Sequence, residues 1–185
     1  MSKIWVISDT HFNHEAIIKY ENRPHNHNEI MKRNLLRLND TYKPGDVLIH
    51  LGDVIFSKAS ELTDILAGIK HKKVLVKGNH DKNGSGWYIR HGFDSVCNYV
   101  VKRRVLFSHI PVDIKSIKTY LDVDYNIHGH LHSNDHRSEE PAIKNIYDES
   151  LHILYAPEKF DYKPILLDNL IKNHEMYNLP RKGNI

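Results

Sequence analysis

The stretch K-V-L-V-K-G-N-H-D at residues 73–81 decides the fold, because a short apolar strand in it leads straight into a glycine and three polar residues. Two earlier stretches have the same plan. The apolar run at residues 47–51 ends at Gly52-Asp53, and the run at residues 3–8 ends at Asp9-Thr10-His11. Side chains at the ends of neighbouring parallel strands meet at one edge of an α/β sheet. The sequence therefore predicts a parallel sheet that gathers these residues into one site.

Two amphipathic helices are predicted between these strands. Apolar residues recur at helical spacing in residues 26–38 and again in residues 60–69. Strand, helix, strand, helix, strand is the order typical of a parallel α/β sheet. From periodicity alone, we expect a mixed α/β protein.

The second half of the chain changes to short strands. Residues 93–108 indicate two or three strands around a turn at Lys102-Arg103-Arg104, and further strands are expected at residues 125–128, 151–154 and 164–167. A closing helix is predicted over residues 168–176, with Asp168 as its N-cap. We expect a single domain over residues 1–177 and a frayed tail over residues 178–185.

Composition excludes several classes of protein. The 185 residues are 40% hydrophobic and 26% charged, which is ordinary for a globular protein, and the net charge of +3 is too small to argue for a nucleic-acid surface. The single cysteine, Cys97, allows no intrachain disulfide and is interpreted as a small core residue. The first strand begins too early for a secretion signal, and no apolar run approaches the roughly 20 residues of a membrane helix. We expect a cytoplasmic protein without a membrane partner.

Five short clusters of possible cation ligands follow one another along the chain. After the three already quoted come Ser108-His109 and Gly129-His130-Leu131-His132. As an ordered set, from Ile4 to about His132, they resemble the calcineurin-like metallophosphoesterase family, although each cluster alone is a weak signal. The resemblance implies two mixed β-sheets packed as a sandwich and flanked by helices. It also implies a dinuclear metal centre.

The resemblance assigns a ligand role to most of these side chains. Asp9, His11 and His132 would bind the first metal, Asp53 would bridge both metals, and Asn79, His109 and His130 would complete the second site. Two divalent ions about 3.5–4 Å apart suit phosphoester hydrolysis, because they screen the phosphate and provide a metal-bound hydroxide for attack. Manganese is the first choice, and iron, zinc, nickel or cobalt also accept such a mixed ligand set.

Further residues have possible roles beside the metals. In the family pattern His80 meets the leaving group and would donate a proton to it, with Asp81 holding His80 in orientation. Asn79 and His80 would also touch the substrate. His14 is either a substrate contact or a loop histidine without a role, and Arg23 is either a phosphate clamp or a solvated surface arginine. His50 and His128 are expected to be buried histidines bonded to backbone or carboxylate.

The predicted function is metal-dependent hydrolysis of phosphodiesters or phosphomonoesters, with nucleotides or nucleic-acid-derived substrates favoured by analogy. The second cluster lacks the Asp-Arg-Gly of phosphoprotein phosphatases, and the third has Asp81 where those enzymes have glutamate. These differences point away from a protein phosphatase. Two alternatives stay open. One is a nuclease acting on polymer, supported by Lys70 to Lys73 and by the Lys102-Arg103-Arg104 turn, and the other is a non-catalytic metal-binding scaffold. The substrate pocket is expected in residues 13–28 and 133–148, and the oligomeric state is left open.

Overall fold

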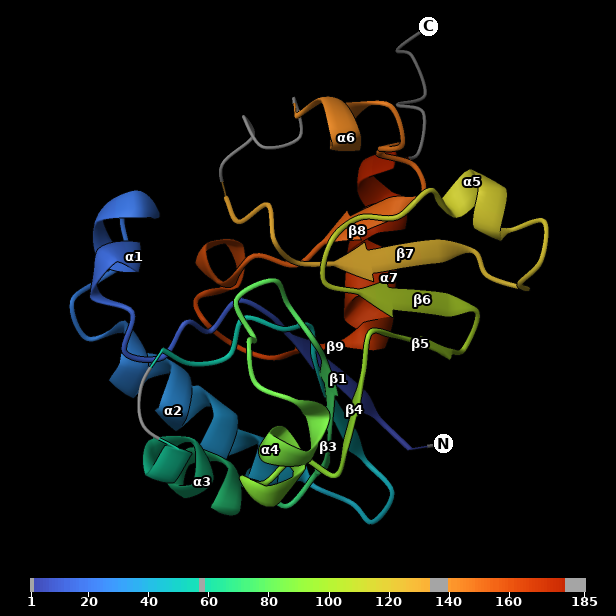
Figure 1. Cartoon of the computed structure of the whole chain (residues 1–185). Helices are drawn as coiled ribbons and strands as arrows, with labels where there is room; N and C mark the ends of the chain where they lie inside the picture. The colour runs from blue at the N-terminus through green and yellow to red at the C-terminus, as the bar shows by residue number, and fades with distance from the viewer. Residues whose placement is uncertain (1, 57–58, 134–139, 179–185) are drawn as a thin grey trace, which may run out of the picture.

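Two β-sheets pack face to face in this computed structural model, which describes residues 2–56, 59–133 and 140–178. The first sheet has the order β4-β3-β2-β1-β9 (Figure 1). Its strands are β1 (Ile4–Ile7), β2 (Val47–His50), β3 (Lys72–Val76), β4 (Ser95–Cys97) and β9 (Ile165–Leu166). Strands β1 to β4 pair in parallel and β9 runs antiparallel to β1, so the predicted parallel sheet and the mixed sandwich are both confirmed.

The second sheet has the order β5-β6-β7-β8. Its strands are β5 (Tyr99–Lys102), β6 (Val105–Ser108), β7 (Tyr125–His128) and β8 (His152–Leu154). Strands β5 and β6 form a hairpin around the predicted turn, whereas β6, β7 and β8 are parallel. The strands before the later clusters therefore run parallel as well.

The main hydrophobic core fills the space between the two sheets and continues to the helices that cover the other face of the first sheet. Strand β6 shows how alternation places its side chains, since Val105 and Phe107 join the core shared with the first sheet. Leu106, between them, packs on the outer face with Ile114 of helix α5 (Ile114–Ile117) and Val123. Both faces of the second sheet are therefore covered in this region.

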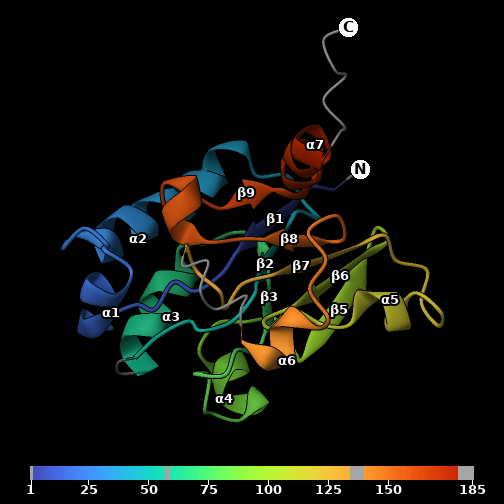
Figure 2. The same ribbon diagram turned by 90° about the horizontal axis from the view of Figure 1, so that it is seen from above.

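The two edges of the sandwich are closed in different ways. At one edge Asn98 alone separates β4 of the first sheet from β5 of the second. At the other edge helix α7 (Leu167–Asn178) packs on β9, β1 and β8, as the view from above shows (Figure 2). The sheets are thus joined at one edge by the chain itself and at the other by a helix.

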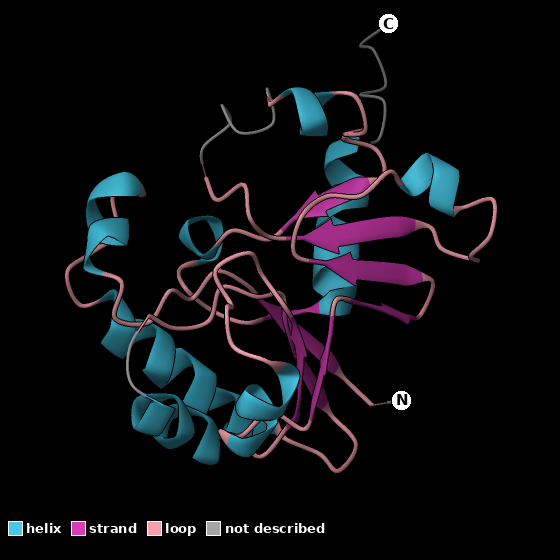
Figure 3. Cartoon of the chain, in the orientation of Figure 1, coloured by secondary structure: helices cyan, strands magenta, loops and turns pink. Residues whose placement is uncertain are grey.

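Helices α2 (His27–Arg37), α3 (Ala59–Ala67) and α4 (Ser85–Arg90) lie on the side of the first sheet away from the second (Figures 1 and 3). The two long ones confirm the predicted amphipathic helices. Shorter helical segments were not predicted, because one or two turns show no periodicity. They are α1 (Glu15–Tyr20), α4, α5, α6 (Pro141–Lys144) and the 3₁₀ turns η1 (Leu38–Thr41) and η3 (Pro157–Phe160).

The closing helix corrects two boundary predictions. Helix α7 begins at Leu167, so Asp168 lies inside its first turn and is not the N-cap. The helix includes Asn178, which was assigned to the tail, and the rest of that tail, residues 179–185, lies outside the described residues. Among the helices that are described, none has the length and apolar character needed to cross a membrane.

Candidate metal centre

All five clusters lie at the carboxyl ends of strands, on one edge of the sandwich. Strands β1, β2 and β3 of the first sheet lead to Asp9, Asp53 and Asn79, while β6 and β7 of the second sheet lead to His109 and His130. The backbone ties the clusters together, because the N–H of Asp9 donates to the carbonyl of Gly52 and that of His11 to the carbonyl of Asp53, both at 3.0 Å. The site is therefore built by both sheets.

Left-handed backbone carries most of the expected ligands. The φ angles are +50° at Asp9, +45° at His11, +55° at Asp53, +67° at His130 and +53° at His132. A side chain in this region costs roughly 1–2 kcal/mol per residue. Such strain gathers where the surrounding structure holds side chains in a functional arrangement, which supports a site here.

The first group consists of Asp9, His11 and His132, all buried. Oδ1 of Asp9 lies 3.7 Å from Nε2 of His11 and 3.5 Å from Nε2 of His132. These separations are too long for hydrogen bonds. Atoms that each bind one ion at about 2.1 Å lie about 3.0–3.4 Å apart, so the three atoms are close to the spacing that a shared cation needs.

The second group consists of Asp9, Asp53 and His109. Oδ2 of Asp53 lies 3.3 Å from Nε2 of His109 and 3.7 Å from Nε2 of His11. Asp53 thus stands between a histidine of each group, as a bridging carboxylate would. Asn79 joins this group through Oδ1, which lies 2.8 Å from Nε2 of His109. His130 is half-buried, with its ring centroid 5.1 Å from that of His109.

Unsatisfied polar atoms show that these residues fit a cation. Oδ1 of Asp9 and both ring nitrogens of His11 are buried without a hydrogen-bond partner among the described residues. Burying polar atoms unpaired costs free energy that a bound ion would offset. The second oxygen of Asp9 is satisfied, since it accepts from Ser8 Oγ at 2.5 Å and from the backbone of His130 at 3.0 Å. One oxygen is therefore held by the protein and the other is left for a metal.

The surroundings of His109 also suit a positive charge. Nδ1 lies 2.6 Å from the carbonyl oxygen of Leu51, so this nitrogen donates to the backbone. Nε2 faces two oxygens, 3.3 Å from Oδ2 of Asp53 and 2.8 Å from Oδ1 of Asn79, so without a metal it carries a proton and donates toward them. Burial alone would lower the pKa of His109, but the carboxylates of Asp53 and Asp9 raise that pKa to about 9. A proton can thus take the place that a metal would fill.

Two glycines before ligands are required by close approach. A Cβ on Gly78 would lie 2.1 Å from Oδ1 of Asp53, and one on Gly129 would lie 2.2 Å from Oδ2 of Asp9. Real Cβ atoms are not found at such distances, so either side chain would displace a carboxylate of the site. Sequence alone could not separate this role from that of an ordinary turn glycine.

Arg23 is neither solvated nor free to clamp a phosphate, and both interpretations of it are wrong. Its side chain is fully buried, with Nε 2.7 Å from Oε1 of Glu158. The other guanidinium nitrogens donate to the carbonyls of Thr10, at 3.1 Å, and Asp9, at 2.8 Å. The guanidinium group therefore fixes the backbone of the loop that follows β1.

Glu158 is a partner of the site that sequence reasoning missed. Oε1 lies 3.6 Å from Nδ1 of His132, on the side of the ring away from Asp9. Burial would raise the pKa of Glu158, but His132 and Arg23 lower it. A carboxylate behind a ligating histidine orients the ring. Glu21, His132 and Glu158 could also hold a cation, although Arg23 already supplies a positive charge there. The sequence A-P-E-K-F around Glu158 contains no signal of this role.

Asp81 does not hold the His80 ring in the structure, because its carboxylate is bonded to other groups. Its carboxylate accepts from the backbone N–H groups of Asp53, at 2.8 Å, Val54, at 3.1 Å, and Gly78, at 2.8 Å. Tyr88 donates its hydroxyl to it at 3.3 Å. Burial raises the pKa of Asp81, and these donors oppose that rise. Asp81 therefore fixes the loops that carry the site.

The mouth of the site contains His80, Asn79 and His14. His80 and Asn79 are exposed, and the backbone N–H of His80 donates to Oδ1 of Asp53 at 2.8 Å. The ring centroid of His80 lies 5.7 Å from that of His11, and the ring centroid of the half-buried His14 lies 5.4 Å from that of His11. The structure thus brings all three next to the metal-binding groups. It also places Phe56 among them, a residue that no sequence signal marked.

His50 and His128 are buried and bonded within the protein, as expected. His50 accepts from the backbone N–H of Gly52 at 3.1 Å and pairs with Thr10 Oγ1 at 3.0 Å, and His128 bonds the carbonyl of Gly129 at 2.9 Å. Burial lowers the pKa of each to about 3. Both rings are therefore neutral supports beneath the site.

Known proteins are similar to this chain in sequence or in structure. An uncharacterized protein of Methanocaldococcus jannaschii is 37% identical over 190 residues, covering 100% of this chain and 98% of that protein. The crystal structure of a protein of unknown function from Aquifex aeolicus has a TM-score of 0.72 at 30% identity, covering 94% of this chain and 100% of that one. A Pseudomonas putida nuclease has a TM-score of 0.48 at 20% identity, covering 70% of this chain and 60% of that one.

The chain also matches a protein family as a whole. Residues 2–147 match the calcineurin-like phosphoesterase superfamily domain. That span contains all five clusters, from Asp9 to His132, which the fold brings to one edge of the sandwich. The chain therefore belongs to the calcineurin-like phosphoesterase superfamily.

Proposed function

We propose that this chain is a metal-dependent phosphoesterase that hydrolyses phosphodiester or phosphomonoester bonds, with nucleotides as its class of substrate. The observation that carries the proposal is the pair of overlapping ligand groups, which share Asp9 and meet between His11 and Asp53. A pair of divalent cations in these groups would supply positive charge for the phosphoester and lower the pKa of a water molecule. Carboxylate, amide and imidazole donors suit manganese, iron, zinc, nickel or cobalt.

The exposed residues at the mouth would act on the substrate directly. Asn79 turns its Oδ1 toward His109, so its NH₂ group is the one left to donate to a phosphate oxygen. The backbone N–H of His80 is bonded to Asp53, which fixes the position of the residue. Its ring is exposed and would face the leaving group of the substrate. A proton from that imidazole to the departing oxygen would assist bond cleavage.

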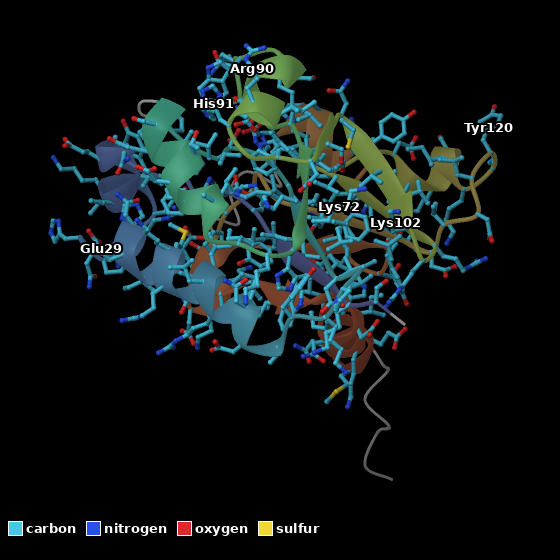
Figure 4. All side chains as sticks on the ribbon, turned by 90° about the horizontal axis from the view of Figure 1, so that it is seen from below. Glu29, Lys72, Arg90, His91, Lys102 and Tyr120 are labelled. Carbon is cyan, nitrogen blue, oxygen red and sulfur yellow. The ribbon has the colours of Figure 1, made fainter. Side chains whose placement is uncertain are left out.

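The distribution of basic residues does not favour the alternative of a polymer-directed nuclease. Lys72 is the first residue of β3, and Asn79 lies beyond its last, so roughly 15 Å of strand separates them. Arg104 of the other basic segment pairs with Asp122 and Asp124, away from His109 at the far end of β6. Figure 4 shows Lys72, Lys102 and Arg90 on separate elements. These residues do not form a continuous basic groove beside the site.

Hydrolysis of bis-p-nitrophenyl phosphate and p-nitrophenyl phosphate, with Mn²⁺ and with EDTA, tests the proposal. We expect Mn²⁺-dependent turnover that Asp53→Asn lowers about 100-fold or more, since even outer partners of metal ligands cost 10- to 100-fold. Asp40→Asn, the same change at an exposed position of η1, should leave turnover unaltered. Metal content per chain should fall in Asp53→Asn alone.

Four results would contradict the proposal or redirect it. Turnover that survives EDTA, or that is equal in Asp53→Asn and wild type, would remove the metal centre from the reaction. Turnover of the monoester alone would restrict the activity to phosphatase chemistry. A folded, metal-loaded protein that hydrolyses neither compound would favour the non-catalytic scaffold.

A further inference from the structure

An exposed aromatic ring lies at the mouth of the metal centre. Phe56 keeps 40% of its surface exposed, although it stacks on His14 with ring centroids 4.1 Å apart and planes at 11°. Its ring also lies 5.2 Å from that of His11 and 5.3 Å from that of His80. Single exposed apolar residues are common on proteins and need no explanation. This ring differs because its neighbours are an expected ligand and the expected proton donor.

The backbone holds Phe56 in place. Its N–H donates to the carbonyl of Phe12 at 2.9 Å, and Phe12 pairs with Ile55 in a parallel β-bridge. The N–H of Phe12 in turn donates to the carbonyl of Val54 at 3.0 Å. The segment that carries Phe56 is thus tied to the segment that carries His11. A ring fixed in this way loses little conformational freedom when a ligand packs on it.

The surroundings suit a flat partner larger than a phosphate. His14 also lines a hollow of about 480 Å³ with Glu15, Lys19 and His25, a volume typical of small-molecule sites. The imidazole and ammonium groups there can bond the polar parts of a nucleotide. The aromatic surface of Phe56 can stack on its base, because every nucleobase has a flat π-face.

We propose that Phe56 binds the nucleobase of a nucleotide substrate by stacking at the mouth of the metal centre, a role that rests on the proposed phosphoesterase function. The phosphate would lie at the ligand groups, beside His80, and the base would lie on the ring. Phe56 is then a substrate-binding residue that distinguishes nucleotides from phosphoesters without an aromatic group.

Calorimetric titration of the Mn²⁺-loaded protein with adenosine 5′-monophosphate and with ribose 5-phosphate tests this role, because the second ligand has the same sugar and phosphate but a hydroxyl in place of the base. We expect wild type to bind the nucleotide at least about fivefold tighter, in line with measured stacking contributions. Phe56→Leu should abolish the preference by weakening the nucleotide alone, and Phe56→Trp should keep it. Tyr99→Leu, at another exposed aromatic residue on edge strand β5, should keep it as well.

Equal binding of both ligands by wild type, or equal weakening of both in Phe56→Leu, would overturn the role of Phe56. The ring would then serve only to pack against His14 and His11. Failure of the nucleotide to bind would overturn it too. Hydrolysis of bis-p-nitrophenyl phosphate by the same protein separates this result from failure of the proposed function, since turnover without a base preference refutes the stacking alone.

Discussion

At the scale of single residues, the metal centre is built on backbone that side chains avoid. Asp9, His11, Asp53, His130 and His132 all have positive φ, and all of them except His130 belong to the two ligand groups. The geometry that suits cation binding therefore costs conformational free energy. Without a bound ion to offset this cost, the strain should lower the free energy of unfolding of the protein.

A pair of substitutions at His130 measures the cost directly. Both His130→Gly and His130→Ala remove the imidazole, but glycine adopts a φ of +67° without strain. We expect the glycine variant to be more stable by about 1 kcal/mol in urea unfolding of the metal-free protein. The order should reverse at Lys32, an exposed position in helix α2, where glycine costs about 1 kcal/mol relative to alanine. An alanine variant as stable as the glycine variant at position 130 would show that the backbone relaxes there.

The side chains that meet in the metal-binding groups could be predicted from sequence, whereas their supports could not. Asp9, Asp53 and His109 are recognisable because each follows a short apolar run, and ligand chemistry limits which residue types can bind a cation. Arg23 and Glu158 come together from positions 135 residues apart, and no local pattern marks such a contact. The support role of Asp81 was not predicted, because adjacency in sequence to His80 suggested a pairing that the backbone of the loop does not make.

At the scale of secondary-structure elements, Asp81 fastens the loop after β2 to the loop after β3. Its oxygens accept from the backbone on both sides, at Asp53 and Val54 and at Gly78, and Tyr88 adds helix α4 to the same junction. One carboxylate thus sets the distance between two ligand-bearing loops. Asp81 therefore continues the connection between β2 and β3 past the last hydrogen bond of their ladder.

Substitution of Asp81 and of His80 should separate support from chemistry. Asp81→Ala leaves three backbone N–H groups without their acceptor, so we expect a loss of about 3 kcal/mol or more in urea unfolding. His80→Ala changes an exposed side chain and should alter stability by less than about 0.5 kcal/mol. Its turnover of bis-p-nitrophenyl phosphate should fall about 100-fold with normal metal content. A stable Asp81→Ala protein with low turnover would support the catalytic role of Asp81.

The elements that sequence predicted well are those whose periodicity is long enough to read. Strands β2 and β7 and helix α2 match their expected ranges within one residue or so, because one buried face fixes the spacing of apolar residues. The short helices α1 and α4, with six residues each, are too short to show such a pattern. The start of α7 was misplaced because Leu167 packs into the core and is helical before Asp168.

At the scale of the whole molecule, stability in acid depends on histidines that are buried without charge. His71 is the clearest case away from the metal centre. It is 1% exposed, packs edge-on to Tyr42, and has both ring nitrogens buried without a hydrogen-bond partner in the part of the chain that is described. Burial lowers its pKa below the usual 6.5, although Asp46 opposes the change. The unfolded chain therefore takes up a proton at a higher pH than the folded one.

Stability should consequently fall as pH drops below about 6.5, and His71→Phe should reduce that fall. For one proton the slope is at most about 1.4 kcal/mol per pH unit, so urea unfolding between pH 5 and pH 8 can resolve it. Wild type and variant should follow parallel curves above pH 7, where the ring is neutral in both states. Identical slopes below pH 6.5 would show that His71 is protonated equally in the folded and unfolded chains.

The division of the ligand groups between two sheets also has a consequence in time. Asp9, His11 and Asp53 come from the first sheet, yet each group takes its third member, His132 or His109, from the second. During synthesis, a ribosome must translate beyond residue 109 before one group exists and beyond residue 132 before both do. A nascent chain that ends after β4 contains the strained loops at Asp9, His11 and Asp53 without the histidines that complete the two groups. A complete ligand group can thus form only after most residues of the hydrophobic core have been synthesised.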